Sequence, residues 1–554
     1  MAAQTKRSRN GTWRLASIGI AAALVALVHA TGEARAAEIT TGSDDVQLRL
    51  DNTLRYNLAY RTDPQDKAII ANPNVDDGDR NFGKGFVSNR LDLLSELDLT
   101  YRGSWGFRVS GAGWFDERYQ SGFGGNGSVA TSNHLVSGQP SVGLSPAAQR
   151  FGGPYGELLD AFAFGQFSVA GVPTYLKVGR HTLYWGESLL LGGATHGISY
   201  AQMPLDLAKG YAVPGTEAKE LFRPLLSVSA QSQLTSTLSL AAQYFLQWEG
   251  FRLPEPGSYL SFNDAVVGGE SLIAGPTRLR HGHDVHPDGT KDWGVSARWT
   301  PDWLEGTLGV YYRRFSDKLP QTHLQPSSGQ YFFAYGDSID LVGVSVSKQI
   351  LNVSVAAELS ARWNMPLLSD PAVVPAGGAL PAPGETLGAR GNTYHGVLNF
   401  LGMLTRTPLW DAGSWSAEVT WNRWDHVSQG LALFKGRDGY TAIDRVTRDF
   451  VGVAGGFTPT WFQVLSGVDV SLPVTYGRGL YGNSAVLTGG NKNAGTYSVG
   501  VSADVRSRYR VDLRYADYFG DYSTSPTGAM TVANGVPALL KDRGTVSLMV
   551  KTTF

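Results

Sequence analysis

The chain has 554 residues, of which 42% are hydrophobic and 11% aromatic, with 68 glycines, no cysteine and a formal net charge of −1. The lack of cysteine excludes disulfides, and the near-zero charge argues against nucleic acid as a partner, which would call for a basic face. This composition is typical of a protein built from strands and turns.

Residues 1–36 are predicted to be a cleaved secretory signal peptide. A basic start, an apolar run over residues 15–28 and the small-x-small pattern Ala34-Arg35-Ala36 follow in that order. A membrane anchor is the weaker interpretation, because the run is shorter than the ~20 apolar residues of a spanning helix. We therefore expect an exported protein whose mature part, residues 37–554, is a single domain.

Two-residue periodicity recurs along the mature chain, over residues 46–61, 91–102, 238–248, 353–363 and 509–515. In each range nearly every second residue is apolar, and the residues between them are smaller or polar. One apolar and one polar face per strand is the pattern of a membrane barrel, whose outer face meets lipid and whose lumen holds water.

Long segments rich in glycine and proline alternate with short links. The long segments are 62–90, 117–156, 182–222, 249–291, 316–337, 364–391, 425–445, 476–494 and 519–541. Long outer loops and short periplasmic turns connect the strands of such barrels. One hairpin per long segment predicts an all-β, antiparallel outer-membrane barrel of 18 strands, with 16 as the alternative.

The stretch "YLKVGRHTLYWGES", residues 175–188, begins as a strand and ends in a charged and aromatic cluster. The segment that follows, residues 182–222, is too long for a plain hairpin, so we expect it to fold into the lumen and narrow it. Arg180 is predicted to pair with Glu187 or with lumen charges. The candidate residues are Asp160, Arg180, His181, Tyr184, Trp185, Glu187, Glu217, Lys219 and Arg223. Structural bracing and a constriction that contacts the solute remain alternative roles.

No motif in the chain predicts catalysis or a cofactor. Nothing resembles a nucleophile elbow or a catalytic triad, so we expect no enzyme activity. His281, His283, Asp284 and His286 have metal-ligand types at close spacing. They lie in an extended polar segment, and we interpret them as a solvated loop rather than a metal site.

The last residues predict the strand that closes the barrel. Val546, Leu548 and Val550 alternate with less apolar positions, and the chain ends in Phe554. A final strand of this form is typical of Gram-negative outer-membrane barrels. Its expected partners are the lipid of the outer membrane and the barrel assembly machinery.

Four segments carry a resemblance to a known family. They are "NFGKGFVSNRLDLLSELDL" (81–99), "LKVGRHTLYWGES" (176–188), "PGTEAKELFRPLLSVSAQSQLTSTLSLAAQYFLQWE" (214–249) and "RLPEPGSYLSFND" (252–264). The chain resembles the outer-membrane proteins grouped as domain of unknown function 1302. This resemblance implies a large barrel associated with sterols, alkanes or other lipid-like compounds. It also implies an outer-membrane-associated periplasmic partner and a large inner-membrane transporter. Where the family usually has glutamine, this chain has His181.

The sequence therefore predicts an outer-membrane channel for hydrophobic or amphipathic solutes. The aromatic and aliphatic content of the long segments is unusual for loops exposed to water. It suits a plug or an apolar entry funnel, and loops that pack on one another are the alternative. Two other functions stay open, a general diffusion porin for small polar solutes and an envelope assembly or scaffold barrel.

Overall fold

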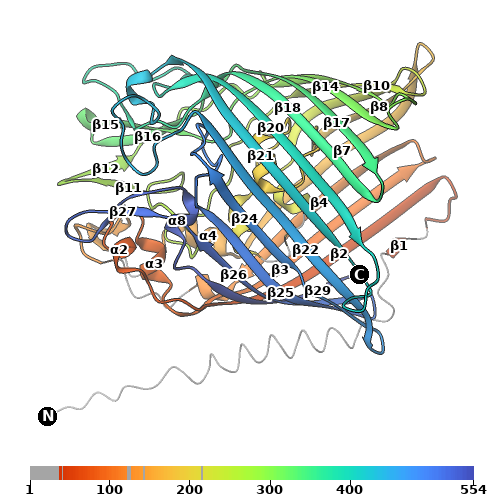
Figure 1. The fold of residues 1–554 in the computed structure, drawn as a ribbon, viewed down its shortest axis with the longest axis horizontal. Helices are drawn as coiled ribbons and strands as arrows, with labels where there is room; N and C mark the ends of the chain where they lie inside the picture. The colour runs from red at the N-terminus through yellow and green to blue at the C-terminus, as the bar shows by residue number, and fades with distance from the viewer. Residues whose placement is uncertain (1–36, 40, 121–126, 141–143, 214–215, 217) are drawn as a thin grey trace.

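The computed structural model describes residues 37–39, 41–120, 127–140, 144–213, 216 and 218–554. The predicted signal peptide and Glu217 lie outside these residues, and both calls stay predictions. The described chain consists mostly of strands that form one barrel (Figure 1).

The wall of the barrel is an antiparallel sheet with 18 strand positions, which confirms the predicted fold class and the predicted number of 18 strands. The wall strands are β2 (Val46–Arg61), β3 (Gly85–Tyr101), β4 (Trp105–Asp116), β7 (Tyr155–Val169), β8 (Val172–His181), β9 (Leu225–Gln233), β10 (Leu238–Phe245), β13 (Trp293–Trp299), β14 (Gly306–Phe315), β17 (Ile339–Ile350), β18 (Val353–Pro366), β20 (Arg390–Leu404), β21 (Ala412–Gln429), β22 (Asp449–Leu465), β23 (Val468–Ser471), β24 (Val474–Tyr481), β25 (Gly495–Val505), β26 (Tyr509–Phe519) and β29 (Thr545–Thr553). β23 and β24 share one position, because both pair with β22 and with β25.

The barrel closes between its first and last wall strands. β29 pairs with β26 on one edge and with β2 on the other. The register with β2 is Tyr56↔Val550, Leu58↔Leu548 and Tyr60↔Val546. Phe554 exchanges backbone hydrogen bonds of 2.8 and 2.9 Å with Asn52, and β1 (Ala37–Ile39) continues along β2 beyond it. Every described wall strand therefore has two neighbours, as lipid requires of a spanning sheet.

The two faces of the wall differ in polarity. On β17, Val342 and Val344 point outward and are 42% and 47% exposed. Leu341 points toward the lumen and is fully buried. On β14, Val310 is 55% exposed and Arg313 is only 1% exposed. An apolar outward face combined with a charged lumen face fits an outer membrane.

Nine long connections gather at one end of the barrel, the end marked by α2, β11, β15 and β27 in Figure 1, whereas the C-terminus lies at the other end. They are residues 62–84, 117–154, 182–224, 246–292, 316–338, 367–389, 430–448, 482–494 and 520–544. The nine predicted long segments are confirmed, although their boundaries move by a few residues. Thus the segment predicted from 476 begins at 482, because the glycine-rich end of β24 still pairs with β22.

Short elements lie within these loops. The helices are α2 (Lys67–Ile70), α3 (Asp77–Asn81), α4 (Pro146–Gly152), α5 (Leu191–His196), α6 (Leu207–Ala212), α7 (Ala218–Leu221), α8 (Val536–Leu539), η1 (Glu117–Tyr119), η2 (Pro326–Ser328) and η3 (Leu431–Leu433). A five-stranded sheet consists of β11 (Ser271–Ala274), β12 (Thr277–His281), β16 (Gln330–Ala334), β15 (Gln321–Gln325) and β19 (Ala372–Val373), and two hairpins pair β5 (Leu135–Val136) with β6 (Gln139–Pro140) and β27 (Tyr522–Thr524) with β28 (Met530–Ala533). In the part of the chain that the structure describes, no helix combines the length and apolar character needed to cross a membrane.

Candidate functional site

The described residues of the connection between β8 and β9 (182–213, 216 and 218–224) run inside the barrel, as predicted. Its helix α5 packs against β20, β21 and β22, which stand across the strand circuit from β8. The segment therefore crosses the lumen, and we call residues 182–224 the crossing loop. A crossing loop needs partners for its own polar backbone once it leaves water.

Glu358 on β18 holds the near part of the crossing loop. This carboxylate is 3% exposed. It accepts a hydrogen bond from Ser188 N at 2.9 Å and one from Ile198 N at 2.6 Å, and the backbone N–H of Glu187 donates to the same group. Hydrogen bonds to a charged acceptor contribute about 1.5–3 kcal/mol each. One wall side chain thus fixes two turns of the loop that are ten residues apart.

Glu418 on β21 holds the far part in the same way. It is 1% exposed and accepts hydrogen bonds from Leu189 N at 2.7 Å and Gly193 N at 2.9 Å. Gly193 lies close enough to Glu418 that a Cβ at this position would overlap with the carboxylate. Glycine here permits the close approach of backbone to carboxylate.

The backbone conformation of Gly186 and its lack of a side chain explain much of the "WGES" motif, residues 185–188. Its φ of +98° lies in a region that side-chain-bearing residues rarely adopt. A Cβ at Gly186 would also overlap with Glu358 Oε1. The turn at Gly186 brings the next two backbone N–H groups onto the Glu358 carboxylate, so the motif is a docking turn inside the lumen.

Two wall arginines bind the carbonyl groups of the same loop. Arg313 Nη1 donates to Ile198 O and Tyr200 O, both at 2.7 Å. Arg362 Nη2 donates to Gly197 O at 2.9 Å and to Thr195 O at 3.1 Å. The lumen wall therefore pairs with both the N–H and the C=O groups of the crossing loop.

Apolar contacts complete the docking. Ile198 and Tyr200 are buried at 0% and 1% exposure against Tyr311, Ile339 and Leu341 of the wall. Burial of such side chains stabilises by about 1.5–3 kcal/mol each. The docked loop therefore has a small hydrophobic core of its own.

Among the predicted residues, Arg180 and Glu187 have separate partners. Arg180 Nη1 lies 3.4 Å from Glu249 Oε1, and Arg223 Nη2 lies 2.5 Å from Glu249 Oε2. Glu187 Oε1 lies 3.5 Å from Arg298 Nη2 on β13. Arg180 has the same strand parity as Val178, which is outward and 45% exposed, so its side chain starts from the face opposite to the lumen.

Four other predicted residues line one cavity of about 710 Å³, which we call the inner cavity. They are Asp160, His181, Tyr184 and Lys219. Asp160 Oδ2 lies 3.4 Å from Arg108 Nε, and Lys219 pairs with Glu96. Leu189 and Phe222 add apolar surface to this lining.

Trp185 takes no part in the inner cavity and packs on Tyr311, with 6.2 Å between ring centroids. Its backbone N–H donates to Gln202 Oε1 at 2.8 Å. The sequence prediction missed Glu358, Glu418, Arg313 and Arg362. The one sequence signal for these four residues is that each is charged and stands on the lumen-facing side of a strand whose other side is apolar.

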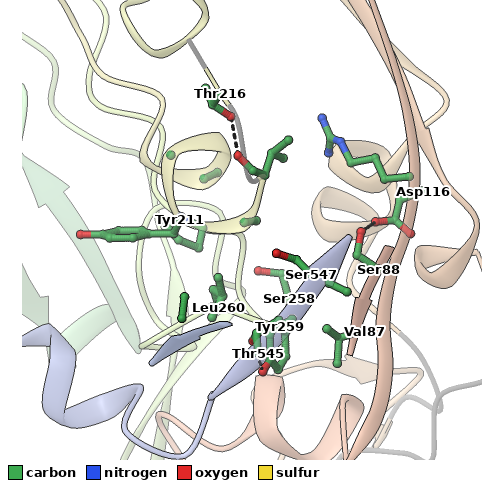
Figure 2. A pocket seen from close by; sticks show the side chains of 18 of the residues that line it. Val87, Ser88, Asp116, Tyr211, Thr216, Ser258, Tyr259, Leu260, Thr545 and Ser547 are labelled. Atoms are coloured by element: carbon green, nitrogen blue, oxygen red, sulfur yellow. Dashed lines mark hydrogen bonds between the residues drawn. The ribbon is translucent and has the colours of Figure 1, made fainter. Parts of the chain in front are cut away.

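A second cavity, of about 460 Å³, lies between the crossing loop and the wall, and we call it the outer cavity. Figure 2 shows Tyr211 and Leu260 from two loops and Ser88 and Ser547 from wall strands around it. Ser88 Oγ donates to Asp116 Oδ2 at 2.6 Å. Leu221 of the crossing loop lines both cavities, so they adjoin at this side chain.

His281, interpreted from the sequence as part of a solvated loop, lies at the end of β12. Its ring stacks on Tyr331 with centroids 4.9 Å apart, and Nε2 lies 2.9 Å from Asp284 Oδ1. The contact with Asp284 raises the pKa of His281, although burial opposes it. These contacts stabilise the five-stranded sheet of the loops, to which β12 belongs.

We expect His196 in α5 to make docking of the crossing loop dependent on pH. Burial lowers the pKa of His196 to about 4, and the charge of Arg362 adds to this effect. Its Nε2 donates to Gly489 O at 2.7 Å, and its Nδ1 lies 3.0 Å from Nδ1 of His395. Only a neutral His196 can accept at Nδ1 while it donates at Nε2.

Acidification should therefore release the crossing loop. In the undocked loop His196 regains a pKa near 6.5, so the neutral, docked state is fully favoured above pH 6.5 and is lost as pH falls toward 4. The expected loss is about 2 kcal/mol at pH 5. Single-channel recordings should show more frequent openings at pH 5 than at pH 7, and His196→Gln channels a flatter response. An unchanged opening frequency would contradict this role.

Comparisons with known proteins come from structures and from a family model. Three solved structures that the chain matches are Acinetobacter baumannii OccAB4 (9% identity, 92% of this chain and 98% of that chain covered, TM-score 0.40), the Pseudomonas aeruginosa outer membrane protein opdK (11%, 92% and 98%, 0.40) and a BenF-like porin from Pseudomonas fluorescens Pf-5 (9%, 92% and 99%, 0.40). These identities are too low to transfer a solute to this chain. No curated protein matches it. The family model described as "Protein of unknown function (DUF1302)" matches residues 17–554, and the chain belongs to this family.

Proposed function

We propose that this barrel is an outer-membrane channel for hydrophobic or amphipathic solutes. The observation that carries the proposal is the lining of the outer cavity. Tyr211, Val213 and Leu260 present apolar surface from the loops, whereas Ser498 and Ser547 present hydroxyl groups from the wall. An amphipathic molecule can place its apolar body on the loops and its polar group toward the wall.

The two cavities supply a route along the crossing loop. The outer cavity of about 460 Å³ is within the ~300–1,000 Å³ range of small-molecule sites. It adjoins the inner cavity at Leu221, and the lining of the inner cavity combines Leu189 and Phe222 with Arg108 and Asp160. A solute that passes Leu221 thus keeps apolar contact on one side and polar contact on the other.

The proposal includes partners on the inner side of the membrane. A barrel in the outer membrane has no access to ATP, so any net transport must draw energy from elsewhere. A periplasmic lipid-binding-like protein would carry the solute across the periplasm, and an inner-membrane transporter would supply the energy. The barrel fold with the crossing loop docked in its lumen favours transport over catalysis.

Solute uptake with Leu221 variants tests the proposal. Cells that lack their own major porins and express this chain should take up 1-N-phenylnaphthylamine faster than cells with Leu221→Trp, by roughly fivefold or more. Arabinose should enter liposomes that contain the protein no faster than control liposomes. Leu234→Trp is the matched control, because Leu234 lies in an exposed turn.

The alternatives give different results. Fast arabinose entry with no effect of Leu221→Trp on the apolar probe would identify a general diffusion porin. Entry of neither solute above background would identify a scaffold barrel.

A further inference from the structure

Three buried carboxylates meet where the outer loops cross. Asp76 and Asp77 come from loop 62–84, where Asp76 precedes α3 and Asp77 is its first residue, and Asp264 comes from loop 246–292. They are 0%, 3% and 1% exposed. One oxygen from each lies within 4.8 Å of the others. Three unneutralised carboxylates in such a place would be very unfavourable.

Little neutralises these groups among the described residues. Arg80 pairs with Oδ2 of Asp76, and Asp264 Oδ2 accepts from Asp77 N at 3.1 Å. The second oxygen, Oδ1, of Asp76 and of Asp264 accepts no hydrogen bond from the described chain, nor does Oδ1 of Asp77. Each carboxylate thus has one oxygen to offer.

Two asparagines give an independent sign of a ligand. Asn81 and Asn133 are each 3% exposed and line the same small cavity of about 10 Å³ as Asp77 and Asp264. Asn81 Nδ2 donates to Gly257 O at 2.9 Å and Asn133 Nδ2 to Ser271 O at 2.8 Å. Because these bonds fix both amides, each Oδ1 is directed away from the carbonyl oxygen that its Nδ2 binds, and neither Oδ1 accepts a hydrogen bond within the described residues.

We propose that Asp76, Asp77 and Asp264, with the amide oxygens of Asn81 and Asn133, bind one Ca²⁺ ion. Ca²⁺ takes carboxylate and carbonyl oxygens at 2.3–2.6 Å, so two ligands of one ion lie at most about 5.2 Å apart. The three carboxylate oxygens lie within 4.8 Å of one another, which is inside this limit. Mg²⁺ fits less well, because it retains water and demands a strict octahedron. A cavity of about 10 Å³ has room for one ion or one water.

The ion would join three outer loops. Asp76, Asp77 and Asn81 belong to loop 62–84, Asn133 to loop 117–154 and Asp264 to loop 246–292. The last of these also carries Tyr259 and Leu260 of the outer cavity. None of the five proposed ligands lines the outer or the inner cavity, so the calcium proposal does not depend on the proposed transport route.

Protons are the rival way to neutralise the cluster. Burial raises the pKa of Asp77 and of Asp264, and their mutual repulsion adds to the effect for Asp77. A cluster that holds protons would bind no calcium at neutral pH, whereas a calcium site exchanges those protons for the ion. Titration with the metal decides between the two.

Isothermal titration of the refolded, chelator-treated full chain with CaCl₂ at pH 7.5 is the test. We expect one Ca²⁺ per chain, with at least tenfold tighter binding than Mg²⁺. Asp77→Asn and Asp264→Asn should each weaken Ca²⁺ binding tenfold or more. Asp438→Asn, which changes an exposed loop carboxylate, should leave it unchanged.

Protease protection of the wild-type chain gives a second readout that needs no variant to fold. Chelation should expose loops 62–84, 117–154 and 246–292 to cleavage, and CaCl₂ should restore protection. Absence of any calcium-dependent heat up to 10 mM, about tenfold above the Kd of the weakest extracellular sites, would overturn the proposal. Equal affinity in Asp77→Asn and Asp438→Asn would overturn it as well.

Discussion

Glu358→Ala should open the lumen. The substitution leaves the backbone N–H groups of Glu187, Ser188 and Ile198 without their acceptor in a buried place. Water that enters replaces these bonds in part, so we expect the docked state to lose roughly 3–5 kcal/mol. That loss shifts the balance between docked and undocked crossing loop by a factor of about 10² to 5 × 10³. Single-channel recordings should change from low conductance with brief openings to a large, steady conductance.

Two further variants make this experiment decisive. Glu418→Ala should have a similar but smaller effect, because its strongest bonds come from two backbone N–H groups, of Leu189 and Gly193. Glu305→Ala removes a carboxylate whose side chain is 82% exposed in a periplasmic turn, and it should leave the conductance as it is. If Glu358→Ala conducts no more than Glu305→Ala, Glu358 does not hold the crossing loop.

Sequence periodicity was sufficient to predict the wall strands, because the alternation of apolar and polar residues arises within each strand. Alternate residues of a strand point to opposite faces, so the apolar face of each strand is visible in ten residues. The same parity shows why Arg180 does not meet Glu187 directly. Arg180 follows Val178 by two positions and starts on the outward face, and it pairs with Glu249 at the rim.

The docking of the crossing loop was beyond the reach of spacing and periodicity. Glu358 accepts hydrogen bonds from backbone groups 160 to 171 residues away in the chain. Any residue type can supply those N–H groups, so no side-chain motif records the contact. What the sequence does record is Gly186, whose lack of a side chain is required by the partner across the lumen.

The same reasoning applies to the candidate calcium ligands. Asn133 and Asp264 come from different loops, and the sequence around each of them is of ordinary loop composition. Only the fold places them together with Asp77. By contrast, His281 and Asp284 are neighbours in sequence and contact each other, yet they belong to a loop sheet.

Gly186→Ala should undock the crossing loop by a different physical route. Alanine at a φ of +98° costs about 1–2 kcal/mol in backbone strain. Its Cβ would in addition overlap with Glu358 Oε1, and this carboxylate cannot move without losing the N–H groups that it binds. We therefore expect a conductance close to that of Glu358→Ala.

Gly439→Ala separates the two contributions. Gly439 has a φ of +81° with open space around its Cβ direction, so this control carries the backbone strain alone and should keep the lumen closed. A double-mutant cycle then isolates the clash. In the Glu358→Ala background, Gly186→Ala should raise the opening frequency little further, because the carboxylate that it strikes is gone. Fully additive effects would mean that Gly186 acts independently of Glu358, and that the turn is required for its backbone conformation alone.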